Sequence, residues 1–158
     1  MEQTTAVTYA GFWKRFVAYI IDDLILSAAG FMVVLMIGAF FGLSFLSLFS
    51  GDSESTAAII AAASVAIVMA GLSFAIIGWL YYALMEASIN QGTLGKMALG
   101  IKVTDLEGNR ISFGKATGRY FGKIVSGMIL YIGFIMAGFT EKKQALHDIM
   151  AGCLVVNK

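Results

Sequence analysis

The sequence predicts an all-α integral membrane protein with two to three transmembrane helices and a small cytoplasmic β-hairpin. Three observations support this fold class. Of the 158 residues, 59% are hydrophobic and only 13% are charged, whereas soluble domains carry roughly 25% charged residues. The mean hydropathy is +0.83. The charges are also unevenly placed, because Asp52 and Glu54 are the only ones between Leu24 and Tyr82.

The composition excludes several classes of protein. Disordered chains lack this much apolar surface, and a net charge of +1 excludes a basic nucleic-acid-binding protein. The single cysteine, Cys153, has no partner for an internal disulfide. The single histidine, His147, excludes a metal site built from several histidines, and the HExxH motif of metalloproteases is absent. We therefore expect no enzyme activity, no cofactor and no metal ion.

Two apolar stretches, from Leu24 to Phe49 and from Ala57 to Met85, exceed the roughly 18 residues that a transmembrane helix needs. Including the aromatic residues before the first stretch, we place the two spans at about residues 16–49 and 57–85. The polar segment from Ser50 to Thr56 contains turn residues and predicts a tight loop. We therefore expect two antiparallel helices within a single membrane domain, residues 1–158.

The basic residues predict an orientation for these spans. Lys14 and Arg15 precede the first span, further Lys and Arg residues follow the second from Lys96 onward, and the loop between the spans has none. Lys and Arg are enriched in cytoplasmic segments. We therefore expect the N-terminus and the segment 86–119 in the cytoplasm, and the loop with Asp52 and Glu54 outside.

The third apolar stretch, residues 120–139, allows two interpretations. As one helix its 20 residues measure about 30 Å, just enough to cross the hydrocarbon core. That crossing would place Lys142 and Lys143 outside, against the preference of basic residues for the cytoplasm. A re-entrant or interfacial helix pair, broken near Gly133, would return the C-terminus to the cytoplasm. We favour the second interpretation, and both two and three spans remain open.

The cytoplasmic segment contains a glycine-rich stretch from Gly92 to Gly100. A phosphate-binding P-loop needs four residues between its glycines, followed by Lys and then Ser or Thr. Here only two residues separate Gly92 from Gly95, and Met97 follows Lys96. We therefore expect a short helix near the membrane surface rather than a phosphate site.

A β-hairpin is expected directly after this stretch. The alternation in Ile101 to Thr104 predicts a strand, and Asp105 to Asn109 has the residues of a turn. Arg110 to Phe113 is typical of a second strand or of the start of a helix. Because an isolated hairpin is marginal in water, Leu154 to Val156 can add a third strand if the C-terminus is cytoplasmic.

A row of small residues follows the predicted hairpin. Gly114, Gly118, Gly122 and Ser126 recur every four residues and so lie on one face of a helix. Small residues allow close approach between helices in lipid, where apolar burial does not drive their association. This row is a candidate contact surface for a homo-oligomer.

The charged residues near the start of the first span are the main candidates for an ion- or proton-binding site. Arg15 and Asp22 lie seven residues apart on one helix face, with Tyr19 between them and Asp23 beside Asp22. Two adjacent carboxylates repel each other, and burial raises their pKa values, so the pair can share a proton or bind a cation through oxygen ligands. If the membrane begins only at Leu24, the carboxylates lie among the headgroups and simply anchor the helix.

Three further polar residues are secondary candidates: His147, Asp148 and Asp105. The adjacent His147 and Asp148 can form a proton relay or a pH sensor, and they can equally form a hydrogen-bonded structural corner. Asp105 lies in the predicted cytoplasmic turn.

Three motifs together resemble the RDD family of bacterial membrane proteins, whose name describes an arginine and two aspartates. The first is Phe12-Trp13-Lys14-Arg15-Phe16 with Ile21-Asp22-Asp23. The second is Gly92-Thr93-Leu94-Gly95-Lys96 with Gly100-Ile101-Lys102-Val103-Thr104-Asp105, and the third is Gln144-Ala145-Leu146-His147-Asp148-Ile149-Met150-Ala151-Gly152. The resemblance extends from about Tyr9 to Val156. It implies a bacterial inner-membrane protein suspected of transport, with cation/proton exchange among the proposals for the family.

Two functions follow from these observations. The first is a small transporter that exchanges Na⁺ or Li⁺ for protons at Asp22 and Asp23, while Arg15 keeps one of them ionised. Two or three spans are too few to enclose a pathway, so this function requires a homo-oligomer as well as a small cation or other small solute. The second is a non-transporting accessory or scaffold protein that binds partner proteins or anionic lipid through its basic segment 96–123. Both functions place the protein in the lipid bilayer.

Overall fold

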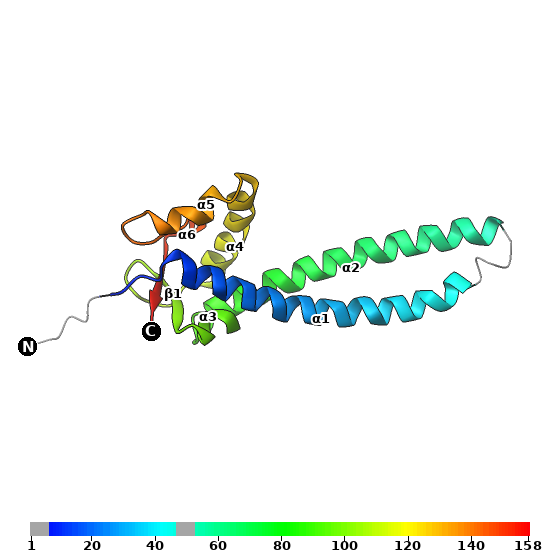
Figure 1. The fold of residues 1–158 in the computed structure, drawn as a ribbon, viewed down its shortest axis with the longest axis horizontal. Helices are drawn as coiled ribbons and strands as arrows, with labels where there is room; N and C mark the ends of the chain where they lie inside the picture. The colour runs from blue at the N-terminus through cyan, green and yellow to red at the C-terminus, as the bar shows by residue number, and fades with distance from the viewer. Residues whose placement is uncertain (1–6, 47–52) are drawn as a thin grey trace, which may run out of the picture. The chain divides into compact units, whose positions relative to one another are not determined.

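The computed structural model describes residues 7–46 and 53–158 and divides into two compact units. Unit 1 contains Met1–Asp23 and Trp79–Lys158, and unit 2 is Leu24–Gly78. The described residues are mostly helical and include a two-stranded antiparallel sheet (Figure 1). This confirms the predicted fold class of a helical membrane protein with a small β-structure.

Two helices are long and apolar enough to cross a membrane. They are parts of α1 (Phe12–Leu46) and α2 (Ser53–Ala87) and comprise Phe12–Met36 and Ile60–Ala87. Their 25 and 28 residues correspond to about 38 Å and 42 Å of helix, more than the roughly 30 Å of the hydrocarbon core. Both helices coincide with the first two stretches that the sequence predicts to span.

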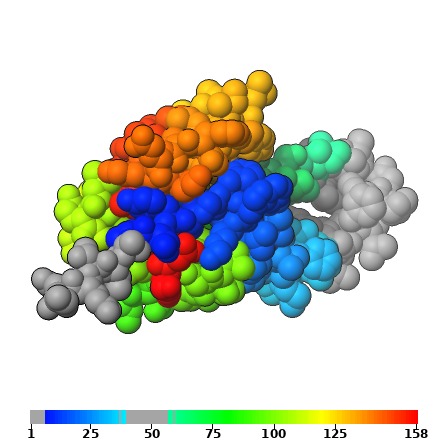
Figure 2. Space-filling model, turned by 60° about the vertical axis from the view of Figure 1, so that its left-hand side comes forward, coloured from blue at the N-terminus to red at the C-terminus, as the bar shows by residue number. Residues whose placement is uncertain are grey.

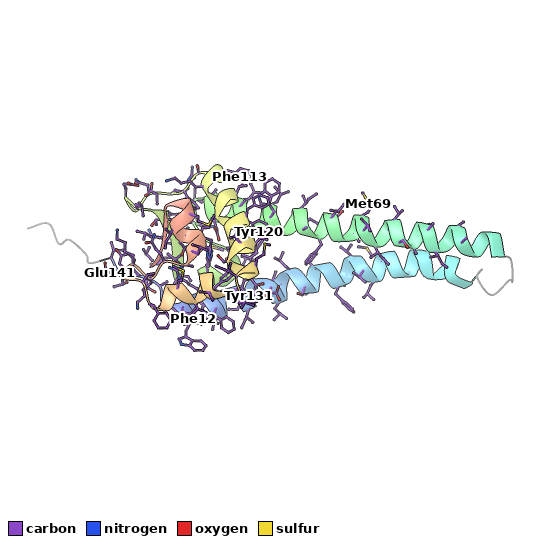
Figure 3. All side chains as sticks on the ribbon, turned by 90° about the horizontal axis from the view of Figure 1, so that it is seen from above. Phe12, Met69, Phe113, Tyr120, Tyr131 and Glu141 are labelled. Carbon is purple, nitrogen blue, oxygen red and sulfur yellow. The ribbon has the colours of Figure 1, made fainter. Side chains whose placement is uncertain are left out.

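Unit 2 is a pair of helical segments whose apolar side chains face outward. Phe31 is 62% exposed, and Met69, which Figure 3 labels on α2, is 57% exposed. The two segments approach closely at Gly30, where an added Cβ would lie 2.6 Å from Cε2 of Phe74. An apolar surface of this extent suits contact with lipid rather than with water.

Helix α2 begins earlier than the sequence predicts. Its first residue is Ser53, so residues 53–56 of the predicted loop are helical. Serine and acidic residues are favoured at the start of a helix, which explains why this polar segment starts α2. The remaining part of the predicted loop, Ser50 to Asp52, lies outside the described residues.

The sheet of unit 1 joins distant parts of the sequence. Strands β1 (Ile101–Asp105) and β2 (Cys153–Asn157) run antiparallel, with Val103 opposite Val155. The strand expected from Ile101 and the added C-terminal strand are therefore confirmed. The short helix expected in the glycine-rich stretch is also present, as α3 (Leu94–Ala98).

The predicted hairpin itself is wrong. Residues 110–113 do not form a second strand beside β1, because they lead into α4 (Phe113–Met128). Ser112 caps this helix, and its side chain accepts a hydrogen bond from the backbone N–H of Lys115 at 3.3 Å. A serine at this position stabilises the first turn of a helix. Of the two alternatives left open by the sequence, the start of a helix is correct.

The N-terminal segment lies against the C-terminal strand. Tyr9 forms a β-bridge with Val156. The backbone N–H of Ala10 donates to the carbonyl of Val155 at 2.9 Å, and that of Asn157 donates to Thr8, also at 2.9 Å. Figures 1 and 2 both show the red C-terminal strand beside the blue N-terminal segment. The described N-terminal residues and the C-terminus are thus tied to the same small sheet.

The third apolar stretch forms a bent pair of helices. Helix α4 ends at Met128, and α5 (Ile132–Ile135) continues into the 3-10 helix η2 (Met136–Gly138). The segment Ile132–Gly138 is bent by 117° relative to α4. The bend lies at Leu130 and Tyr131, whose φ angles are +53° and +61°, two to three residues before Gly133, near which the break was expected. Gly133 instead permits close packing, because an added Cβ there would lie 2.7 Å from Oγ of Ser126.

The row of small residues on α4 serves a contact within the chain. At Gly122 an added Cβ would lie 3.0 Å from Cβ and 3.2 Å from Cα of His147, which belongs to α6 (Leu146–Ala151). At Gly118, one turn earlier, an added Cβ would meet nothing within 4 Å. The C-terminal half of the row therefore lets α6 pack against α4.

This difference between two glycines of one helix can be tested. Gly122→Ala is expected to lower the free energy of unfolding by about 1 kcal/mol or more, because the methyl group overpacks the contact with α6. The matched variant Gly118→Ala is expected to stabilise by about 0.5–1 kcal/mol, because alanine is the better helix former. Thermal unfolding of the detergent-solubilised protein measures both. Equal effects of the two variants would contradict the packing described at Gly122.

Candidate functional site

A buried cluster of charged side chains connects several elements of unit 1. At its centre Arg119 of α4 donates through Nη1 to Oε2 of Glu86 at 2.6 Å and through Nε to Oδ1 of Asp148 at 2.7 Å. Glu86 comes from the end of α2 and Asp148 from α6. The three residues are only 2%, 1% and 0% exposed. Since a buried charge is costly without a partner, each of these groups depends on the others.

Two lysines surround the other oxygen of Glu86. Lys96 of α3 forms an ion pair with Oε1, and Nζ of Lys123 lies 3.6 Å from the same oxygen. The Lys123 ammonium also lies 4.0 Å from the ring centroid of Tyr82, a cation–π contact. Lys123 follows Arg119 by four residues, so both project from one face of α4.

Arg15 completes the cluster at the Asp148 end. Its Nη1 forms an ion pair with Asp148, its Nε donates to the carbonyl of Ala10 at 2.9 Å, and its Nη2 donates to the carbonyl of Lys143 at 2.5 Å. Arg15 therefore pairs with Asp148 rather than with Asp22. The structure thus joins a residue of the first predicted site to the secondary candidates near the C-terminus.

Asp22 is fully buried and accepts hydrogen bonds from three donors. The Tyr81 hydroxyl at 2.9 Å and the Gly95 N–H at 2.7 Å donate to Oδ1, and the Thr93 hydroxyl donates to Oδ2 at 2.5 Å. The Tyr81 hydroxyl in turn accepts the backbone N–H of Leu94 at 3.1 Å. Hydrogen bonds to a carboxylate stabilise its charged form. Asp22 therefore ties α1 to the start of α3.

The contact between Asp22 and the start of α3 explains why the motif around Gly95 is rich in glycine. An added Cβ at Gly95 would overlap the carbonyl oxygen of Ala18 and lie 3.0 Å from Oδ1 of Asp22. Only glycine lets the backbone of α3 approach α1 this closely. Thr93 and Gly95 then bind Asp22, while Lys96 binds Glu86. The motif therefore positions α3 among buried carboxylates.

The other two candidates of the first span lie differently. Asp23 is exposed, so it does not share the buried position of Asp22. Tyr19 is 50% exposed and lines a pocket beside the charged cluster. The structure therefore separates the two adjacent carboxylates that the sequence suggested as a pair.

His147 is buried between α4 and the charged cluster. Its Nδ1 lies 3.4 Å from Oγ of Ser126, and its Nε2 lies 3.6 Å from Oδ1 of Asp148. Burial lowers the pKa of His147 to about 3, although Asp148 opposes this shift. The imidazole is therefore neutral across the range in which an ordinary histidine titrates.

The two remaining secondary candidates have different roles. Burial alone would raise the pKa of Asp148, but Arg119 and then Arg15 outweigh burial and hold that pKa below its usual range. Asp105 closes the turn after β1, because its Oδ1 accepts the backbone N–H groups of Glu107 at 3.0 Å and Asn109 at 2.7 Å. Asp148 thus belongs to the cluster, and Asp105 stabilises a turn.

A pocket of about 320 Å³ lies beside the charged cluster. Its lining includes six polar residues: Arg15, Asp22, Lys96, Arg119, Lys123 and His147. The remaining walls are largely aromatic: Phe12, Phe16, Tyr19, Tyr82, Tyr131 and Phe134. Figure 3 shows Tyr131 at the bend after α4 and Phe12 at the start of α1. Buried charges next to aromatic walls are typical of a binding site for a small molecule.

Sequence reasoning missed the centre of this site. Glu86 was not considered, Arg119 was counted only among the basic residues that predict orientation, and Lys123 only as part of the basic segment 96–123. All three are buried in the cluster or line the pocket. Two signals could have found them. Lys123 lies inside an apolar stretch, and Arg119 is spaced from it by one helical turn. A charge in an apolar stretch is a functional candidate by default.

The fold and this site define a helical membrane protein with a charged pocket. The chain belongs to the RDD family, which matches residues 9–152 and confirms the resemblance seen in the motifs. It is 42% identical to the uncharacterized protein YxaI of Bacillus subtilis (strain 168), over 94% of this chain and 97% of that protein. It is 31% identical to the uncharacterized membrane protein YteJ of the same organism, over 95% of this chain and 82% of that protein. No solved structure matches the chain.

Acidification is expected to destabilise the protein through His147. The pKa of this residue is about 3 in the folded chain, against an ordinary value of 6.5. Between these values the unfolded chain binds a proton that the folded chain does not, so stability present at pH 7 is lost as the pH falls below about 6.5. The loss between pH 7 and pH 5 is about 2 kcal/mol. Melting temperatures measured between pH 7 and pH 5 give the dependence of stability on pH.

His147→Gln is the matched variant for this prediction. It removes the titrating group, while Asp148, Glu86, Arg119 and Lys123, the charged groups that act on the imidazole, remain. We expect the melting temperature of this variant to change much less between pH 7 and pH 5. The same slope in the variant and in the natural protein would rule out His147 as the source.

Proposed function

We propose that the protein is a small transporter of the bacterial inner membrane and that the pocket of unit 1 is its solute site. The observation that carries this proposal is the position of the charged cluster. Five charged side chains line one pocket that is formed in part by helices apolar enough to cross a membrane. Charges in such segments are costly and are retained where they serve a function. No residue has a catalytic role in this proposal.

Exchange of Na⁺ or Li⁺ for protons is the form of transport in which Asp22 takes the ion. Among the residues that the structure describes, Asp22 is the one carboxylate that lines the pocket. Hydroxyls of Tyr81 and Thr93 lie beside it. Oxygen ligands of this kind suit hard cations. The three donors occupy three of about four lone-pair sites of this carboxylate, so a bound cation takes the remaining site or displaces a donor. Asp23, being exposed, takes no part in this version of the site.

A flux assay separates Asp22 from Asp23. Purified protein is reconstituted into vesicles with an internal pH dye, and Na⁺, Li⁺ or K⁺ is added against a pH gradient. Asp22→Asn is expected to lower cation-dependent proton flux at least about tenfold, because the buried ionisable group is lost. Asp23→Asn, which changes an exposed neighbour, is expected to retain it. Melting temperatures of both variants check that each is folded.

Three outcomes of this assay contradict parts of the proposal. Equal loss of flux in both variants would show that Asp22 has no special role. Full activity in vesicles that each hold a single chain would contradict the need for an oligomer, which we propose because two or three spans enclose too little space for a pathway. Absence of flux for every solute in the natural protein would favour the accessory function.

The accessory function receives less support from the geometry. It relies on the basic segment 96–123, but Lys96, Arg119 and Lys123 of that segment bind Glu86 and line the pocket. Only Lys102, Arg110 and Lys115 remain available for partner proteins or for anionic lipid at the surface. Each such residue contributes about 1 kcal/mol to binding of an anionic membrane, so this surface is modest.

We also propose that both ends of the chain lie in the cytoplasm. The tie between Tyr9 and Val156 and the pairing of β1 with β2 support one common side for these segments. With α1 and α2 as the two crossings, the bent pair of α4 and α5 then enters and leaves the membrane on that same side. The excess of Lys and Arg in these segments favours the cytoplasm.

Cysteine labelling tests this topology. In a Cys153→Ala background, Lys158→Cys is expected to react with a membrane-impermeant maleimide only after the cells are permeabilised. Asp52→Cys, placed in the loop expected outside, is expected to react in intact cells. Labelling of Lys158→Cys in intact cells would mean that the 120–139 stretch crosses the membrane fully or that the orientation is reversed.

A further inference from the structure

The charges around the pocket do not balance. Four cations line the pocket: Arg15, Lys96, Arg119 and Lys123. Three carboxylates lie among them, Asp22, Glu86 and Asp148. The formal charges of these seven side chains leave one positive charge in excess. Burial lowers the pKa of Lys96 to about 7, and Arg119 and Lys123 add to this effect while Glu86 opposes it. An uncompensated charge is costly in an apolar environment. The cluster is relieved of this excess either by loss of the Lys96 proton or by an added negative charge, and the second keeps Lys96 in its ion pair with Glu86.

Two cations in the pocket retain donors for such a charge. Lys123 has its nearest carboxylate oxygen at 3.6 Å, beyond hydrogen-bond distance. Arg119 uses Nε and Nη1 for its two carboxylates, which leaves Nη2. In the described part of the chain, Thr104 Oγ1 is the one buried side-chain polar atom without a partner. Neither Nη2 of Arg119 nor Nζ of Lys123 belongs to this class of fully buried atoms, and both residues line the pocket.

The other cations of the pocket are less available. Arg15 uses all three of its guanidinium nitrogens, for Asp148 and for the carbonyls of Ala10 and Lys143. The ammonium of Lys96 binds Glu86. An anion is therefore expected at the side of the pocket formed by α4, which carries Arg119 and Lys123.

The rest of the pocket suits an apolar group. Its aromatic lining includes Phe16 and Tyr131, which are 44% and 67% exposed and so mark the mouth of the pocket. Ile135, also part of the lining, is 46% exposed. These residues belong to α1, whose first 25 residues are apolar enough to cross a membrane, and to the bent helix pair. A mouth of this composition opens more favourably to lipid than to water.

We propose that the pocket binds an amphiphilic anion, with its carboxylate or phosphate group at Lys123 and Nη2 of Arg119 and its apolar body against the aromatic wall. The inference rests on the proposed function only in taking this pocket as the ligand site. It names an anion as the ligand class, in place of the Na⁺ or Li⁺ of the exchange form. The lipid-facing mouth points to an acidic phospholipid as the source. A water-soluble organic anion has the same chemistry and is the other source to be tested.

Titration of the detergent-solubilised protein, followed by native mass spectrometry, tests the ligand class. The probes are dihexanoylphosphatidylglycerol, dihexanoylphosphatidylcholine with the same chains but no net charge, 1-naphthoate as a soluble anion, and inorganic phosphate. We expect phosphatidylglycerol to bind at least about tenfold more tightly than phosphatidylcholine and than phosphate. Tight binding of 1-naphthoate alone would keep the ligand class and assign it to a soluble source.

Variants of Lys123 locate the anion. Lys123→Met is expected to weaken phosphatidylglycerol binding about tenfold, and Lys123→Arg is expected to retain it. Glu86 keeps Arg119 and Lys96 as partners in both variants, so we expect both to fold. Lys115→Met removes an exposed charge two turns earlier on the same helix and is expected to leave binding unchanged.

Several results would overturn the inference. These are equal binding of the two phospholipids, binding of phosphate as tight as that of phosphatidylglycerol, or equal losses in Lys115→Met and Lys123→Met. If Lys123→Met does not fold, the comparison of the four probes on the natural protein still tests the ligand class. Anion binding without flux of any solute would sink the transport proposal and leave this inference standing. Cation flux without anion binding would support the transport proposal and overturn this inference.

Discussion

The guanidinium of Arg119 lies between the carboxylates of Glu86 and Asp148, and the packing of unit 1 depends on this contact. Arg119 comes from α4, Glu86 from the end of α2 and Asp148 from α6, so one side chain joins three helices. Removing one partner of a buried ion pair costs about 3–5 kcal/mol, because the other charge stays buried without compensation. Lys96 and Arg15 extend the same constraint to α3 and to the start of α1.

The pocket lies beside this cluster. Four cations are in ion pairs with two carboxylates, and the third carboxylate, Asp22, is occupied by neutral donors. Aromatic side chains around the excess charge leave a space whose polar side is basic. The same buried basic residues therefore hold the helices of unit 1 together and form the polar side of the proposed ligand site.

The sequence alone predicts the two long helices, the strand at Ile101 and the short helix α3, because apolar length and local turn chemistry need no tertiary information. It also singles out Arg15, Asp22 and Asp148 as residues with unusual positions. It does not predict their partners, because those depend on how α3 and α6 fold back against α1 and α4. The burial of Glu86 and the direct pairing of β1 with β2 are likewise long-range properties. Local patterns therefore suggested a hairpin partner at residues 110–113 and gave the C-terminal strand only a third place in the sheet.

A double-mutant cycle on Glu86 and Arg119 tests the central claim most directly. Free energies of unfolding are measured for Glu86→Gln, for Arg119→Gln and for the double variant. Each single variant takes one of its ion-pair partners away from a buried charge. We therefore expect the double variant to be less destabilised than the sum of the two singles, with a coupling of about 1–3 kcal/mol. Effects that add to within about 0.5 kcal/mol would contradict the claim that this ion pair organises unit 1.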